Sequence, residues 1–146
     1  MLTEVNIWKI IKILSIIGIV LASYLFYNFL AYNVFSFTPL EVCNISKSVN
    51  CDAPTRGSLS TIIGIPVSLI GLIGYFTILY SALTKKKKLA LGMTTFGMIF
   101  CLRLTFIELF VIHVICPVCV LCQIIMFVVW LLSIKLNFSK NTPITS

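Results

Sequence analysis

Residues 117–134 consist of PVCVLCQIIMFVVWLLSI, 18 residues without a charged side chain. An α-helix rises about 1.5 Å per residue, so about 20 apolar residues cross the roughly 30 Å hydrocarbon core of a bilayer. The strands of membrane barrels are shorter, about 10 residues, and alternate apolar with polar positions. The run therefore predicts a membrane-spanning helix that ends near Lys135.

Three runs of the same character precede it in the chain. They lie at about residues 10–34, 62–83 and 89–115. The second of them carries no charge, whereas the third contains Arg103, Glu108 and His113. The sequence thus predicts an all-α integral membrane protein, a four-transmembrane-helix bundle. It forms a single domain over residues 1–146, with a long outer loop over residues 35–61 between the first and second spans.

The composition of the whole chain agrees with this class. Of the 146 residues, 60% are hydrophobic and 10% are charged, and the mean hydropathy is +1.11. An ordinary soluble domain has about 25% charged residues. The composition therefore excludes a disordered chain, a collagen-like fibre and a soluble disulfide scaffold.

The net charge of +7 comes from basic residues near the ends of the predicted spans. Eight lysines and one glutamate lie in the N-terminal tail with the first residues of the first span, in the lysine run at 85–88 and in the C-terminal tail. Because basic loops remain in the cytoplasm, we expect a multi-pass protein of the plasma (inner) membrane with both termini cytoplasmic. No basic stripe is interleaved with aromatic residues, so we expect no nucleic-acid partner.

Four of the six cysteines fall at the predicted outer face. Cys43 and Cys51 lie in the long loop, and Cys116 and Cys119 form a Cys-Pro-Val-Cys motif at the start of the fourth span. Pro117 suits the first turn of a helix, where a backbone N–H has no partner, so Cys116 is the predicted N-cap. Backbone N–H groups and the positive end of the helix dipole would then lower the pKa of its thiol.

These thiols are compatible with three kinds of function. Cysteine pairs at an oxidising face suit thiol–disulfide redox chemistry, while two static disulfides would belong to a structural tetraspan protein. Four thiolates also suit a soft-metal transporter. Cys101 and Cys122 fall inside the predicted spans, and we interpret them as small apolar residues. The position of both outer pairs favours redox chemistry, and we expect no bound metal.

Two segments of the sequence resemble the vitamin K epoxide reductase (VKOR) family, in particular its bacterial and archaeal members. The first is Cys51-Asp52 followed by IIGIPVSLIGLIGY at 62–75, which is similar to the second-span signature of that family. The second is ICPVCVLC at 115–122, which is similar to its active-site motif. The resemblance covers about residues 10–132. In other quinone-linked four-helix thiol oxidases the Cys-x-x-Cys motif comes before the second pair, so the order found here favours the VKOR family.

The resemblance implies a membrane thiol–quinone oxidoreductase that supports disulfide formation in exported proteins. Cys116 and Cys119 would be the catalytic pair beside a quinone of the ubiquinone or menaquinone type, and Cys43 and Cys51 would shuttle electrons to them. The electrons would come from a thioredoxin-like carrier on the outer face and leave to the membrane quinone pool. Because the chain ends at Ser146, we expect this carrier to be a separate protein. Epoxide reduction is not implied.

Several polar residues are candidates for the vicinity of the quinone. Ionisable groups within a span are functional candidates, although contacts between helices or with lipid headgroups are the alternative roles. The family usually has a serine six residues after the second loop cysteine, where this chain has Gly57 with two serines nearby. The residues we expect near the quinone are Ser58, Ser60, Arg103, Glu108 and His113.

Overall fold

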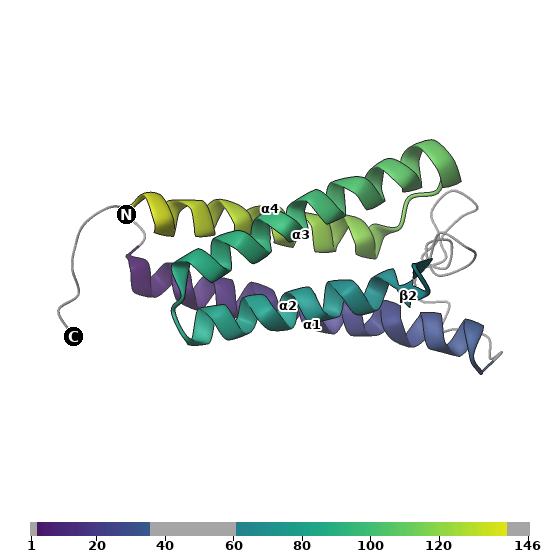
Figure 1. The fold of residues 1–146 in the computed structure, drawn as a ribbon, viewed down its shortest axis with the longest axis horizontal. Coiled ribbons are helices and arrows are strands. Elements are labelled where there is room, and N and C mark those ends of the chain that lie inside the picture. Colours follow the sequence, from purple (N-terminus) through teal and green to yellow (C-terminus); the bar gives the residue numbers. More distant parts are fainter. Residues whose placement is uncertain (1–2, 36–60, 140–146) are drawn as a thin grey trace.

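A computed structural model of the chain describes residues 3–35 and 61–139. Four helices run along one long axis (Figure 1): α1 (Glu4–Asn33), α2 (Val67–Leu83), α3 (Lys87–Ile107) and α4 (Pro117–Phe138). The π-helical turn η4 (Glu108–Ile112) continues α3, and the short strands β1 (Thr61–Ile62) and β2 (Ile65–Pro66) pair antiparallel just before α2. The predicted four-helix fold is confirmed.

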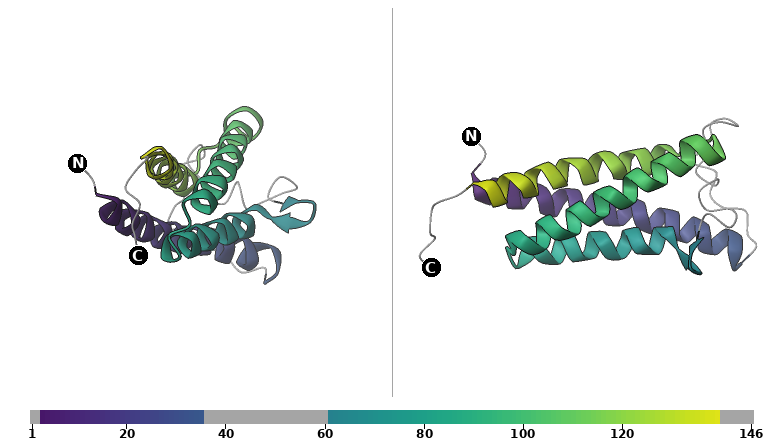
Figure 2. Two further views of the ribbon diagram at one scale, coloured as in Figure 1. Left: turned by 60° about the vertical axis from the view of Figure 1, so that its left-hand side comes forward. Right: turned by 45° about the horizontal axis from the view of Figure 1, so that its top comes forward.

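The helices form a closed bundle, because each one packs against two neighbours. α1 contacts α2 and α4, and α3 contacts the same two helices, as two further views show (Figure 2). Within residues 3–35 and 61–139, three apolar segments are long enough to cross a membrane, namely Glu4–Asn33, Lys87–Val111 and Pro117–Phe138. At 17 residues, α2 is shorter and extends about 26 Å.

The ends of the helices differ from the predicted spans where the backbone leaves the helical conformation. We expected a second span from residue 62, but α2 begins at Val67. Its N-cap is Pro66, and Ile63 and Gly64 have φ values of 55° and 80° in the turn of the hairpin. The third helical segment ends at Ile112 and not at residue 115, because His113 has a left-handed φ of 54°. α4 begins at Pro117 as expected and continues to Phe138.

Two contacts define one end of the bundle, which we call the lysine end. The Lys87 ammonium lies 2.7 Å from a Glu4 carboxylate oxygen, and the Asn137 side-chain amide donates to the Lys87 carbonyl at 2.9 Å. The starts of α1 and α3 and the end of α4 therefore meet there. The end of α1, the hairpin, η4 and the start of α4, whose N-cap is Cys116, lie at the opposite end, the cysteine end (Figure 1).

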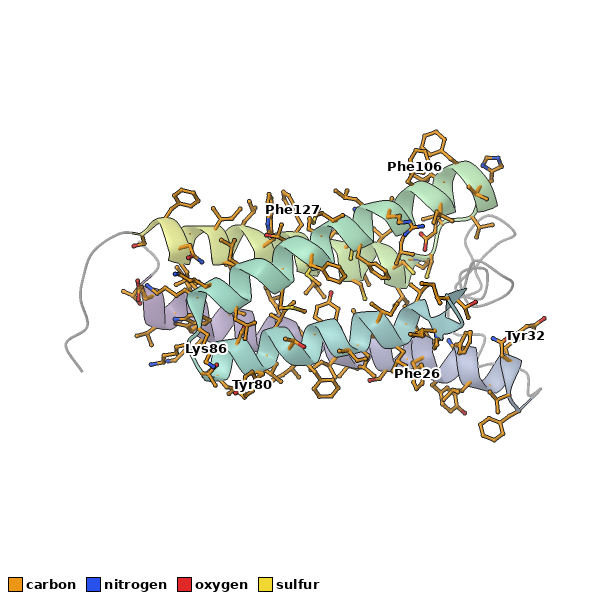
Figure 3. The ribbon with its side chains drawn as sticks, in the orientation of Figure 1. Phe26, Tyr32, Tyr80, Lys86, Phe106 and Phe127 are labelled. Atoms are coloured by element: carbon orange, nitrogen blue, oxygen red, sulfur yellow. The ribbon has the colours of Figure 1, made fainter. Side chains whose placement is uncertain are left out.

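The interior and the surface of the bundle are both apolar. Ile11, Ile78 and Val129 are fully buried in the core, whereas Phe106 and Phe127 point away from α3 and α4 (Figure 3) and remain exposed. A soluble monomer rarely exposes such an apolar surface. A surface of this kind fits hydrocarbon as its solvent, in agreement with a membrane protein.

Candidate active site

Cys116 is the N-cap of α4, as the sequence predicts. Its backbone is extended, with φ −93° and ψ 111°, and its sulfur accepts a hydrogen bond from the Cys119 backbone N–H at 3.4 Å. The Val120 N–H donates to the Cys116 carbonyl at 3.1 Å and closes the first turn. The Cys116 side chain is completely buried, so the cap holds one sulfur in a fixed position against the helix terminus.

Hydrogen bonds to this sulfur favour its charged form. The pKa of the Cys116 thiol is lowered, first by the Cys119 thiol and then by the backbone N–H groups of Cys119 and Val118. Burial and the Glu108 carboxylate act in the opposite direction on this pKa but do not outweigh the donors. Because the thiolate is the reactive form of cysteine, Cys116 is the more nucleophilic member of the pair. Neither cysteine forms a disulfide with another cysteine among the described residues.

Glu108 lies next to both cysteines. Its carboxylate accepts a hydrogen bond from the Cys116 backbone N–H and is one of two acceptors for the single proton of the Cys119 thiol, the other being the Cys116 sulfur. The residue is 7% exposed and opens η4, whose last turn brings the Val114 N–H to the Glu108 carbonyl at 3.2 Å. This reversal of the chain after His113 brings Cys116 back beside the carboxyl group. A π-helical turn inside an α-helix is frequently found at a functional site.

A cavity of about 130 Å³ lies between the four helices, and Cys119 forms part of its wall. All four helices contribute apolar side chains to it, such as Leu25, Phe100 and Met126. The polar and thiol side chains in the wall are Ser68, Tyr75, Cys101, Thr105, Glu108, Cys119, Cys122 and Gln123. The Cys-x-x-Cys motif thus connects the cysteine end of the bundle with an apolar interior cavity.

Hydrogen bonds fix three of these polar groups. The Tyr75 hydroxyl donates to the Cys122 carbonyl at 2.8 Å and ties α2 to α4. The Thr105 hydroxyl contacts the Gln123 side-chain oxygen and lies 3.1 Å from the Cys101 carbonyl. These contacts hold Thr105 and Gln123, on facing helices, at one wall of the cavity.

The structure brings together only some of the residues that we expected near the quinone. Glu108 lines the cavity, while Arg103 and His113 are exposed and are not part of its wall. The His113 Nδ1 atom lies 2.8 Å from the Leu109 carbonyl. Four further residues lie outside the described residues, namely Cys43, Cys51, Ser58 and Ser60.

The sequence did not identify Tyr75, Thr105 and Gln123 as residues of the cavity wall. Cys101 and Cys122, which we interpreted as small apolar residues, also line the cavity. Hydropathy averages over a run and hides single polar residues within it. A periodic signal was present, because cavity residues of α3 recur at three- and four-residue spacing, for example at Met93, Gly97 and Phe100. Which of several faces borders a cavity depends on the neighbouring helices.

Among residues 3–35 and 61–139, no three His, Cys, Asp or Glu side chains are close enough to hold a metal ion. Two of the four thiols in this part of the chain, Cys116 and Cys119, lie as a pair beside the Glu108 carboxylate, and Cys119 borders the cavity. This arrangement suits exchange of electrons and protons between a dithiol and an apolar acceptor.

A family model matches residues 9–134, and its description is the vitamin K epoxide reductase family. The chain belongs to this family. A comparison with curated proteins finds no match. Membership in the vitamin K epoxide reductase family implies a multi-pass membrane protein with thiol–disulfide oxidoreductase activity. Members of the vitamin K epoxide reductase family are in general linked to quinones and work with thioredoxin-like partners.

Proposed function

We propose that the chain oxidises a thioredoxin-like partner outside the membrane and passes the electrons to a quinone, thereby supplying disulfides to exported proteins. One observation carries this proposal. Cys119 belongs both to the Cys-x-x-Cys motif at the end of the bundle and to the wall of the apolar cavity between the helices. A dithiol in this position is in contact with both of the environments that such a transfer has to connect.

The cavity suits one quinone ring. Its volume of about 130 Å³ is close to that of a cavity of about 150 Å³ that accommodates benzene. The cavity is partly open, which allows an isoprenoid tail to extend out of it. The Gln123 side-chain N–H would donate to a ring carbonyl, because Thr105 contacts the oxygen of this amide and not its nitrogen. The other walls are largely apolar, as in most cofactor sites. A bound quinone supplies an acceptor for two electrons and two protons.

The two thiols have different tasks in this proposal. Cys116, with its lowered thiol pKa, lies nearer the end of the bundle and exchanges with the loop pair Cys43 and Cys51. A loop thiolate attacks the Cys116 sulfur of the Cys116–Cys119 disulfide, a mixed disulfide forms, and Cys119 leaves as the thiolate. The second loop thiol then attacks the mixed disulfide, which regenerates the loop disulfide and leaves both motif cysteines reduced. The partner dithiol re-reduces the loop disulfide by the same chemistry.

The test is anaerobic mixing of the purified, fully reduced protein with a short-chain quinone while the quinone absorbance is followed. We expect stoichiometric reduction by the native chain and none by Cys116→Ala or Cys119→Ala. The matched control is the same chain with its thiols converted to disulfides beforehand, because this form has the same sequence and no electrons to donate. A folded protein with titratable thiols that reduces no quinone would overturn the proposal.

A structural role for the cysteines predicts a different result. In that case Cys116→Ala would lower the unfolding temperature in detergent, and the remaining folded fraction would reduce quinone at the native rate. Unfolding and quinone reduction are therefore measured on the same preparation.

A further inference from the structure

Glu108 is a buried carboxyl group that thiol exchange alone does not require. It is 7% exposed. Within residues 3–35 and 61–139, the ion pair in the structure is that of Lys87 with Glu4, at the lysine end. Glu108 thus has no cationic partner among these residues. A buried charge without a counter-ion is costly. Two donors offset part of this cost, the Cys119 thiol and the Cys116 backbone N–H.

The titratable groups around Glu108 come from three helices. Cys101 on α3 interacts with it electrostatically, Cys116 and Cys119 on α4 hydrogen-bond to it, and Tyr75 of α2 lines the same cavity. Arg103, the nearest cation along α3, is exposed and not part of the cavity wall. The Cys119 thiol is therefore the proton donor in direct contact with this carboxylate, and the cavity is its other neighbour.

Oxidation of the dithiol releases protons as well as electrons. The formation of the Cys116–Cys119 disulfide removes two electrons and leaves no proton on either sulfur, while the reduction of a quinone to a quinol consumes two electrons and two protons. Cys116, whose lowered pKa favours the thiolate, has lost its proton before the transfer begins. The Cys119 thiol still carries its proton, and the Glu108 carboxylate is an acceptor in contact with it.

We propose that Glu108 takes the thiol proton of Cys119 as the disulfide forms and delivers it to the cavity, where quinone reduction consumes it. This inference rests on the proposed function and adds a proton path to it. The second proton of the quinol comes from water. Glu108 accepts the proton at the carboxylate oxygen that the Cys119 thiol already contacts, so no rearrangement of the chain is needed.

The alternative is that Glu108 only positions α4 through the Cys116 N–H. Two substitutions separate these roles. Glu108→Gln keeps an oxygen that accepts the Cys116 N–H but cannot take up a proton under these conditions. Glu108→Asp keeps the ability to accept a proton and shortens the side chain by one methylene. Glu4→Gln, at the lysine end, is the matched control for loss of a carboxylate.

The first measurement is single-turnover quinone reduction by the reduced full-length chain over a range of pH. General acid–base catalysis contributes about 10²–10⁴-fold, so we expect Glu108→Gln to slow the reaction by about 10²-fold. We expect the native rate to fall towards low pH for two reasons, because a protonated Glu108 accepts nothing and a protonated Cys116 is no longer a thiolate. Only the fall caused by Cys116 should remain in Glu108→Gln. Glu108→Asp restores most of the rate and the pH dependence, and Glu4→Gln matches the native chain.

The second measurement needs no quinone. An infrared difference spectrum is recorded when a chemical thiol oxidant converts the dithiol to the disulfide. We expect the carbonyl band of a protonated carboxyl group to appear in the native chain and in Glu4→Gln, and to be absent in Glu108→Gln. This spectrum of the native chain tests the proposal even where Glu108→Gln fails to fold.

An unchanged rate and pH profile in folded Glu108→Gln, or a native spectrum without the carboxyl band, would overturn the proton path. Both results leave the electron path intact if Cys116→Ala and Cys119→Ala still abolish quinone reduction. Quinone reduction that persists in these two variants would instead refute the proposed function.

Discussion

Donors to the Cys116 sulfur among the described residues include the Cys119 thiol and the backbone N–H groups of Val118 and Cys119, and of these the Cys119 thiol lowers the Cys116 pKa most. Cys119→Ala removes this donor but retains the backbone N–H groups, so the Cys116 pKa should rise. A lowered pKa means that the thiolate persists as the pH falls below the usual range of a thiol. In Cys119→Ala the thiolate should therefore disappear at a higher pH than in the native chain.

Thiolate absorbance during a pH titration measures this shift, with the spectrum of Cys116→Ala subtracted to isolate the one sulfur. Cys101→Ala serves as the control, because Cys101 is not among the groups that shift the Cys116 pKa. Equal midpoints in Cys119→Ala and in the native chain would show that the backbone donors alone determine the pKa.

Gly18 of α1 lies directly against the ring of Tyr75. A Cβ atom at Gly18 would overlap with three ring carbons, and the ring has little freedom to move because the Tyr75 hydroxyl is bonded to the Cys122 carbonyl at 2.8 Å. Overpacking of this kind costs about 1–3 kcal/mol. We expect Gly18→Ala to lower the free energy of unfolding in detergent by about this amount.

Gly92→Ala is the matched control for Gly18→Ala. Gly92 is also helical, and a Cβ atom there would meet nothing within 4 Å. Alanine is the better helix former by about 1 kcal/mol, so this variant should be as stable as the native chain or slightly more so. Equal stabilities of the two variants would mean that the ring moves aside without cost.

The helices were predictable where one local signal decided the outcome. Pro117 after a cysteine predicts the start of α4, and the structure places it there with Cys116 as the cap. The hairpin before α2 and the turn η4 were not predicted, because both lie within continuous apolar runs and hydropathy does not distinguish helix from turn. Gly64 and Pro66 were the residues that signalled the later start of α2.

The cavity was beyond sequence reasoning for a different reason. Its wall combines residues of four helices, such as Tyr75, Thr105 and Gln123, and which faces meet depends on the packing of the whole bundle. The motif predicted the position of the thiol pair, whereas Glu108 was one of several ionisable candidates. Its contact with Cys119 depends on η4, which returns the chain towards α3.

The η4 turn itself can be tested by deletion. A π-helical turn holds one residue more than an α-helical turn, and Val111 within it is exposed. Deletion of Val111 should convert the turn to α-helix, retain the helix content and move Cys116 away from the Glu108 carboxylate. A displacement of about 1 Å at a reacting group can cost about 10²-fold in rate.

We therefore expect the deletion to slow single-turnover quinone reduction by about 10²-fold while circular dichroism remains unchanged. Val111→Ala, which keeps the length of the turn, should react at the native rate. A deletion variant that is as fast as the native chain would show that the extra residue has no part in placing Glu108.

The molecule as a whole places its lysine run at the end of the bundle opposite the thiol pair (Figure 1). The lysine end carries the Lys87–Glu4 pair and Lys86, whose ammonium lies 5.9 Å from the centre of the Tyr80 ring. Tyr32 lies at the other end of α1, which belongs to the cysteine end (Figure 3). Basic loops stay in the cytoplasm, so the lysine end should face the cytoplasm and the cysteine end the outside. This orientation is what the proposed exchange with exported thiols requires.

Two single-cysteine reporters test the orientation, each introduced into a chain whose own cysteines are replaced by serine. Lys86→Cys reports on the lysine end, and Ile63→Cys on the hairpin at the cysteine end, where Ile63 is 96% exposed. A membrane-impermeant maleimide should label Ile63→Cys in right-side-out vesicles and Lys86→Cys in inverted ones. The reverse pattern would place the thiol pair in the reducing cytoplasm, where disulfides are rarely kept, and would be incompatible with a supply of disulfides to exported proteins.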